Sequence, residues 1–208
     1  MKGIVTAVLL LALSGCSAIK LNPASSGEVG FRTPIEGVTA QLILSQDFQR
    51  KVLTQKPSYG KAWGPREFEI AVGRPLSQAI AADTKSRILS SRIGDRADGK
   101  PSTVTITPQT ISLEFGVDDG RAMGFMAGFG ILAAGSDAVV GAKATLKALV
   151  AVNDGAPALI EVVGASALKL TYLSINESDV NKVVGLALDD AAEKLGDAVA
   201  NKTSAALN

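Results

Sequence analysis

The residue with the most distinctive chemistry is Cys16, the only cysteine in the chain. It follows Leu13-Ser14-Gly15, which closes a mostly apolar run that begins at Val5, behind the basic Lys2. A basic residue, about nine apolar residues and then small residues are typical of a secretory signal. The run is about half as long as a membrane-spanning helix requires, and it leads into a cysteine instead of an A-x-A-like cleavage site. The sequence therefore predicts an exported protein with Cys16 at the end of its signal.

Leu13-Ser14-Gly15-Cys16 resembles the lipobox of bacterial lipoproteins, in which the cysteine becomes the first residue of the mature protein. This resemblance covers about the first 17 residues. It implies cleavage before Cys16, a thioether-linked diacylglycerol on the Cys16 sulfur, and an N-acyl chain such as palmitate. Two or three acyl chains anchor a protein stably to a membrane. Ser17 is neutral, as in lipoproteins sorted to the outer membrane, which implies a periplasm-facing outer-membrane protein in a two-membrane bacterium. The covalent lipid on Cys16 is the only prosthetic group that we expect.

The composition argues against several classes of function. Cleavage before Cys16 would leave 193 residues with 20 basic and 20 acidic side chains. Nucleic-acid binding is not expected from such a balance, because it requires a net basic face. The chain has no histidine, and therefore lacks the commonest general base and the commonest metal ligand. It also lacks a G-x-S-x-G elbow, a phosphate-binding Gly-Lys-Ser/Thr loop and His/Cys metal spacing. We expect a protein that is not an enzyme.

Two groups of side chains remain as candidates for a site. Glu67 and Glu69 could serve acid–base chemistry, although the exposed face of a strand explains the pair more simply. The second group is aromatic and basic: Tyr59, Trp63, Phe68, Lys61 and Arg66. It could form a glycan- or partner-binding surface, and aromatic side chains that close one end of the core are the simpler explanation. Scattered serines and lysines leave an envelope hydrolase with Ser–Lys or carboxylate chemistry as the remotest alternative.

These residues must be positioned by a domain that we expect over residues 37–208. It follows the signal peptide, residues 1–15, and a tether over 16–36 that we expect to be flexible because it is rich in Ser, Gly and Pro. Alternating apolar residues predict strands at 38–45, 68–72, 104–117, 143–153 and 159–175. We expect a bulge at Pro108 and a hairpin turn at Asn153-Asp154-Gly155. The last strand is either one bent strand or two that are broken at Gly164.

Helical spacing predicts one helix over 76–93, capped by Gly94, and a long amphipathic helix from Val180 to about Ala205. Consecutive strands joined by hairpins favour an antiparallel sheet. The predicted fold class is therefore α+β, an antiparallel β-sheet with helices on one face and a long C-terminal amphipathic helix.

The segment 122–142, AMGFMAGFGILAAGSDAVVGA, is nearly free of charge and rich in glycine. It is interpreted either as a helix or hairpin buried against the sheet, or as a hairpin that enters the outer membrane or packs against copies of itself in a ring. Glycines four residues apart allow helices to approach closely in a membrane. The residues that would make membrane or subunit contacts are Gly124, Phe125, Met126, Gly128, Phe129, Ile131 and Leu132.

The anchor and the order of elements together resemble small envelope lipoproteins that serve as accessory subunits of transport or export machinery. Examples are the partners of outer-membrane lipopolysaccharide, polysaccharide and curli export channels. The resemblance implies a non-enzymatic binding or scaffold subunit of an envelope complex, held to the membrane by its lipid. The alternative is an oligomeric channel or secretion component that inserts residues 122–142 into the outer membrane. Cys16 is the only functional residue that the resemblance transfers.

Overall fold

Two sheets and a long C-terminal helix organise the chain in the computed structural model, which describes residues 18–26, 30, 32–60, 63–119, 137–153 and 155–207. The larger sheet has the strand order β5-β2-β6-β7-β8 and the smaller one the order β1-β4-β3. The strands are β1 (Ile19–Leu21), β2 (Thr39–Ile43), β3 (Val52–Gln55), β4 (Phe68–Ala71), β5 (Ser90–Gly94), β6 (Val104–Asp118), β7 (Asp137–Val152) and β8 (Ala158–Thr171). The helices are α2 (Gln46–Gln49), α3 (Gly73–Arg87), the short 3-10 helix η3 (Tyr172–Ser174) and α5 (Glu177–Leu207).

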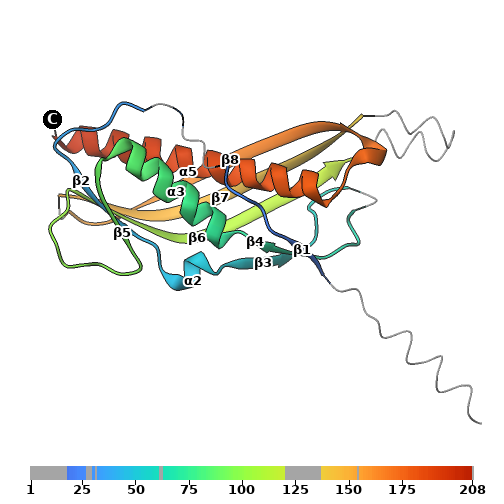
Figure 1. Cartoon of the computed structure of the whole chain (residues 1–208), viewed down its shortest axis with the longest axis horizontal. Helices are drawn as coiled ribbons and strands as arrows, with labels where there is room; N and C mark the ends of the chain where they lie inside the picture. Colours follow the sequence, from blue (N-terminus) through green and yellow to red (C-terminus); the bar gives the residue numbers. More distant parts are fainter. Residues whose placement is uncertain are drawn as a thin grey trace, which may run out of the picture.

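The helices α3 and α5 cover one face of the larger sheet (Figure 1), and the predicted α+β class is confirmed. The long strands β6, β7 and β8 pair antiparallel, as expected. The short strand β2 differs, because it pairs parallel with both β5 and β6. Parallel neighbours require crossover connections, which α3 and its flanking segments provide before β5, and residues 95–103 provide after it.

The β7–β8 hairpin follows from strict alternation of apolar and polar residues. Ala144, Leu146, Ala148 and Val150 are fully buried, while the residues between them are partly exposed. Asn153 adopts a positive φ of 50° in the connection, a conformation that asparagine tolerates better than most residues. The predicted hairpin is confirmed, and β8 continues unbroken through Gly164. The shift in the β6–β7 register between Pro108 and Thr110 confirms the predicted bulge.

The helix α5 has one buried face, which includes Val184, Leu188, Ala191 and Leu195. Its first turn is capped by the side-chain oxygen of Asn176, which accepts a hydrogen bond of 2.8 Å from the Ser178 N–H. Such a cap satisfies a backbone donor that has no partner within the helix. The long C-terminal helix is therefore confirmed.

The helix predicted over residues 76–93 is wrong at its end. α3 ends at Arg87, and Ile88 takes an extended conformation. Residues Ser90–Gly94 then form β5 along the edge of β2, because backbone pairing with β2 outweighs the helical spacing of this stretch. Leu89, between the two elements, is 77% exposed. The polar stretch 47–63 also contains most of α2 and all of β3, and the sequence pattern predicted neither element.

The flexible tether predicted over residues 16–36 also differs from the structure. Ile19–Leu21 pair in parallel with Phe68–Ile70 of β4, and the Leu21 side chain is fully buried. Further along, the Ser25 hydroxyl donates a hydrogen bond of 2.6 Å to Asp189 of α5. Ile19 and Leu21 alternate with Lys20, so even this short stretch has an apolar side that packs on the domain. The folded domain therefore begins at β1.

Gly164 provides a test of how α5 packs on β8. A Cβ atom at this position would meet the Ala187 carbonyl oxygen and the Ala191 backbone nitrogen, so we expect Gly164→Ala to force α5 away from the sheet and to lower the free energy of unfolding by about 1–3 kcal/mol. Gly94→Ala is the matched control in a strand, because its nearest atom would lie at an ordinary contact distance of 3.4 Å. Urea unfolding measures both, and equal midpoints for the two variants would contradict the close packing.

Candidate functional site

The residues that the sequence singled out for membrane contact lie outside the described part of the chain. This holds for Cys16 and for the seven residues between Gly124 and Leu132. The end of the apolar segment is described, and Asp137–Ala142 belong to β7, where Ala138 and Val140 are buried. These six residues are part of the folded sheet. The segment 122–142 is therefore too long as a membrane-inserted hairpin, which would have to end before Asp137.

Two of the three aromatic residues of the second candidate group, Trp63 and Phe68, close one end of the core, as expected. The Trp63 ring stacks on Phe68 with 5.9 Å between ring centroids, and Phe68 meets Phe115 edge to face. The Arg66 guanidinium lies 5.1 Å from the centre of the Trp63 ring, a cation–π arrangement. Tyr59 lies elsewhere, with its ring over Gly116 and its hydroxyl against Gly141.

A groove opens beside Trp63, and we call it the end groove. It has a volume of about 580 Å³, and its other wall is η3 and the start of α5. The residues that line it are Trp63, Arg66, Tyr172, Leu173, Ile175, Asn176, Glu177 and Ser178. Leu173 is 61% exposed. Partial burial, with a smaller contribution from Asp119, raises the pKa of the Tyr172 phenol, so this hydroxyl is neutral at physiological pH.

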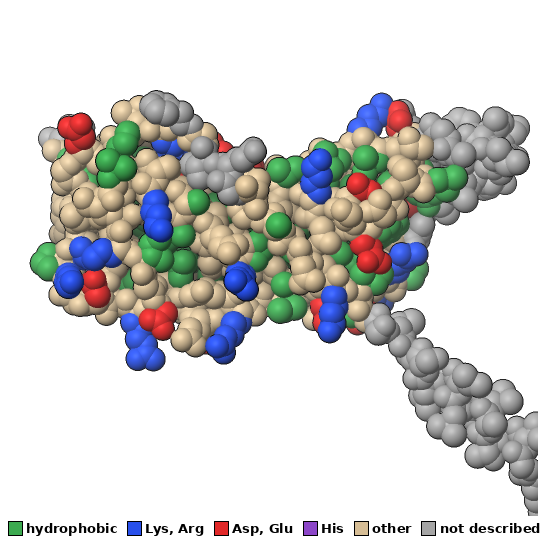
Figure 2. Space-filling model, viewed as in Figure 1, with side chains coloured by type: hydrophobic (Ala, Val, Ile, Leu, Met, Phe, Trp, Pro, Cys, Tyr) green, Lys and Arg blue, Asp and Glu red, His purple; other side chains and the backbone are tan. Residues whose placement is uncertain are grey.

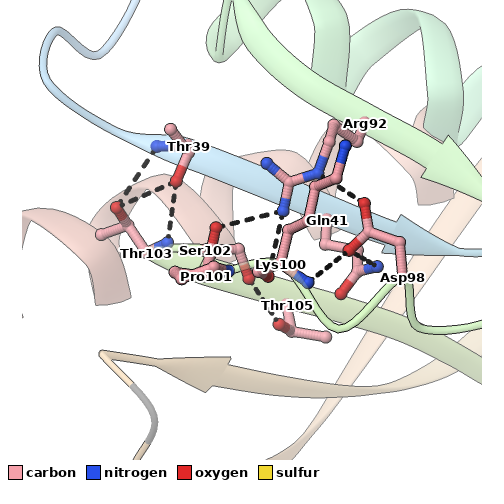
Figure 3. Close-up of polar contacts among 9 residues, drawn as sticks. All are labelled: Thr39, Gln41, Arg92, Asp98, Lys100, Pro101, Ser102, Thr103 and Thr105. Atoms are coloured by element: carbon pink, nitrogen blue, oxygen red, sulfur yellow. Dashed lines mark hydrogen bonds and ion pairs between the residues drawn. The ribbon is translucent and has the colours of Figure 1, made fainter.

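A polar cluster at the opposite end holds the 95–103 crossover on the outer face of the sheet (Figure 3). Asp98 accepts hydrogen bonds of 2.8 Å from both Gln41 and Arg92. Arg92 also donates to the carbonyl oxygens of Lys100 and Pro101. The Lys100 backbone N–H, and then the Arg92 guanidinium, lower the pKa of the Asp98 carboxyl. The donors and acceptors of the cluster are paired with one another, so its role is to hold the crossover on the sheet. We call these contacts the clasp.

A second charged cluster lies between α3 and α5. Arg87 pairs with Asp83 at 2.7 Å and with Asp197 at 2.8 Å, directly beside Gly196 of α5. Burial raises the pKa of the Asp83 carboxyl, although Arg87 pairs with it. The arrangement joins the two helices through paired charges.

The outer face of β7 and β8, on the side away from α5, carries exposed side chains that pair across the two strands. Leu149 faces Leu159 across the two strands, and Leu159 is 59% exposed. Next to them, Lys147 and Glu161 form an ion pair of 2.9 Å. In the described chain no element packs over this row, which mixes apolar and charged side chains as the surfaces of protein interfaces do.

The free edge of β8 is partly covered by two side chains of α5. Lys194 donates a hydrogen bond of 2.9 Å to the Val163 carbonyl, and Asp190 accepts one of 2.7 Å from the Ala165 N–H. Lys194 and Asp190 also pair with each other. Charged side chains over an edge strand oppose pairing with another strand, so we expect partners to use the face of β8 more readily than its edge.

The described residues contain no group of three or more Cys, Asp or Glu residues that could hold a metal ion. Glu67 is exposed and Glu69 is half-buried on β4 opposite Lys20, as expected for the face of a strand. None of the helices in the described ranges is both long and apolar enough to cross a membrane.

Comparison with known proteins gives only distant likenesses. No protein-family model matches the chain, and no curated protein matches it. Among solved structures, a Xanthomonas campestris protein described as family-model DUF330 is 13% identical over 92% of this chain and 100% of its own, with a TM-score of 0.47. A minor lipoprotein from Acinetobacter baumannii is 10% identical over 81% of this chain and 96% of its own, with a TM-score of 0.44. Because both TM-scores lie below 0.5, we base the functional inference on this chain's own residues.

Acidification tests the clasp around Asp98. Its pKa is lower in the folded state than in the unfolded chain, so its contribution to stability is complete above about pH 4 and is lost as the pH falls below that value. We expect Asp98→Asn to show a smaller drop in Tm than the wild type between neutral pH and about pH 3. Glu114→Gln, at an exposed position of β6, is the control and should keep the wild-type drop. An unchanged drop in Asp98→Asn would contradict the clasp.

Proposed function

We propose that this protein is a lipid-anchored, periplasm-facing subunit of an envelope transport or assembly complex in the outer membrane, where it binds or scaffolds other envelope proteins without catalysis. The lipobox resemblance at Leu13–Cys16 supports the anchor. The outer face of β7 and β8 around the Leu149–Leu159 pair, over which no described element packs, supports the binding role, and it is the observation on which the proposal chiefly rests.

That outer face suits a protein partner for two physical reasons. The strands β7 and β8 contain 16 and 14 residues, so at about 3.3 Å per residue they form a platform roughly 46–53 Å long. The platform is also rigid, because its other face is packed against α5. The Leu149–Leu159 pair supplies apolar area, and the Lys147–Glu161 ion pair beside it supplies directional polar contacts.

The distribution of charge is consistent with a protein partner. On the face shown in Figure 2, Lys and Arg side chains are interspersed with Asp and Glu, and the described residues form no broad basic stripe there. A stripe of this kind is the electrostatic footprint of a nucleic-acid-binding protein. We therefore favour recognition by shape and by apolar contacts over recognition by net charge.

Co-purification tests the proposal directly. The lipidated protein, tagged at Asn208, is extracted in mild detergent, sized, and analysed by mass spectrometry. We expect it to be recovered with an envelope transporter or export channel, and we expect Leu159→Glu to lose that partner because a carboxylate would be buried in the interface without a counter-charge. Leu186→Glu is the matched control, because Leu186 is a 37% exposed leucine on α5.

The other outcomes are distinguishable. A large homo-oligomer without another protein would favour the channel alternative, and a lone monomer would contradict both. Loss of the partner in Leu186→Glu but not in Leu159→Glu would place the binding surface on the helical side.

A further inference from the structure

The position of β1 sets the distance between the lipid anchor and the folded domain. Ile19 is hydrogen-bonded through its N–H to the Glu67 carbonyl at 2.9 Å, so the chain is fixed to the domain from this residue on. Only three residue steps separate Ile19 from Cys16. A chain advances at most about 3.6 Å per residue, so the Cα atoms of Cys16 and Ile19 lie within about 11 Å of each other.

The start of β1 lies on the Trp63 side of the end groove. Ile19 pairs with Phe68 of β4, and Phe68 carries the stacked Trp63 ring. The Arg66 guanidinium lies 5.1 Å from the centre of the Trp63 ring, so it is on the same side of the domain. Trp63 and Arg66 line the end groove together with Tyr172 and Leu173. The end groove is thus the part of the described domain next to the point where the anchor enters.

From this geometry we propose that the domain rests with its end groove directly on the bilayer surface, with phospholipid headgroups as the occupant of the groove. The inference rests on the lipidation of Cys16 that is part of the proposed function. The polar headgroup layer is roughly 5–7 Å thick on each side of the hydrocarbon core. A connection of at most about 11 Å lets the start of β1 rise no more than roughly 4–6 Å beyond that layer, so this end of the domain stays at the headgroup surface.

The side chains of the groove suit such an occupant. Tryptophan, tyrosine and arginine are favoured at membrane–water interfaces, because each combines an apolar body with a polar end. The exposed Leu173 can enter the boundary between headgroups and acyl chains, and Arg66 can pair with a lipid phosphate. The charged residues that line the groove, Arg66 and Glu177, have opposite signs, so binding does not depend on anionic lipids.

This orientation directs the other end of the molecule into the periplasm. α5 begins beside the end groove and runs for 31 residues to Leu207, which corresponds to about 46 Å at 1.5 Å per residue. The C-terminus lies at the end of the molecule opposite η3 (Figure 1). The Leu149–Leu159 row is on the part of the sheet near the β7–β8 turn, and is therefore presented away from the membrane.

The chain contains a single tryptophan, Trp63, which serves as a native reporter. The lipidated protein is reconstituted into phosphatidylethanolamine–phosphatidylglycerol vesicles that contain a lipid with a nitroxide on its headgroup. Leu207→Cys, labelled with bimane, supplies a second reporter at the far end of the same molecule, because the only native thiol is consumed by the lipid. We expect the nitroxide lipid to reduce the Trp63 emission and to leave the bimane emission unchanged.

A spacer variant tests whether the short connection is the cause. Insertion of a flexible Gly/Ser segment between Ser17 and Ala18 should restore the Trp63 emission, while the protein still floats with the vesicles. Leu173→Glu should reduce the quenching of Trp63 as well, and Leu159→Glu, at the far end, should not.

Each remaining outcome overturns the inference. A protein that floats with the vesicles but shows no quenching of Trp63 is anchored and held clear of the bilayer, so the anchor survives and the docking fails. Equal quenching of both reporters indicates a molecule that lies flat on the membrane. A protein that does not float lacks the lipid on Cys16, and then the proposed anchor fails together with the docking.

Discussion

The close approach of α5 to the β7–β8 ladder is the constraint on which the rest of the structure depends. It is possible because Gly164 has no side chain at the point where the Ala187 and Ala191 backbones cross the strand. Small residues on both elements let the helix bury a continuous apolar face along the sheet. Once this 31-residue helix is fixed, its remaining faces become available to position other segments.

Those faces explain why the N-terminal segment is ordered. Asp189 accepts hydrogen bonds from the Ser25 hydroxyl and the Ser26 N–H, and Glu193 pairs with Arg32. Contacts of this kind contribute modestly one by one, but they act on a chain that β1 has already fixed at Leu21. The same helix also provides Asp190 and Lys194 over the edge of β8. One element therefore organises both the core and the route of the chain toward its anchor.

Much of the fold was predictable from the sequence because the long elements have clear periodicity. The local sequence alone predicted the alternation in β6–β8, the bulge at Pro108 and the amphipathic face of α5. The short elements could not. β1 has only three residues, and the Ser- and Gly-rich residues that follow it suggested a flexible chain, because pairing with β4 is a long-range interaction that local composition does not reveal. β5 was mistaken for the end of a helix for the same reason. The end groove was partly predictable: Trp63 and Arg66 stood out, but Leu173 lies more than 100 residues away in sequence.

The pairing of β1 with β4 changes what the proposed lipid anchor can do. A flexible tether of about 20 residues would let the domain sample many orientations and distances, since its end-to-end length would be about 25 Å on average. With the proposed lipid on Cys16, a three-residue connection would remove most of that freedom, because the domain would be fixed at one end and its rigid hairpin would extend away from the anchor. Fixing both position and orientation lowers the entropic cost of binding a partner at a defined height above the membrane. A rigid platform near the β7–β8 turn, joined to the bilayer by a short connection, is therefore suited to a subunit that spaces or aligns other envelope proteins.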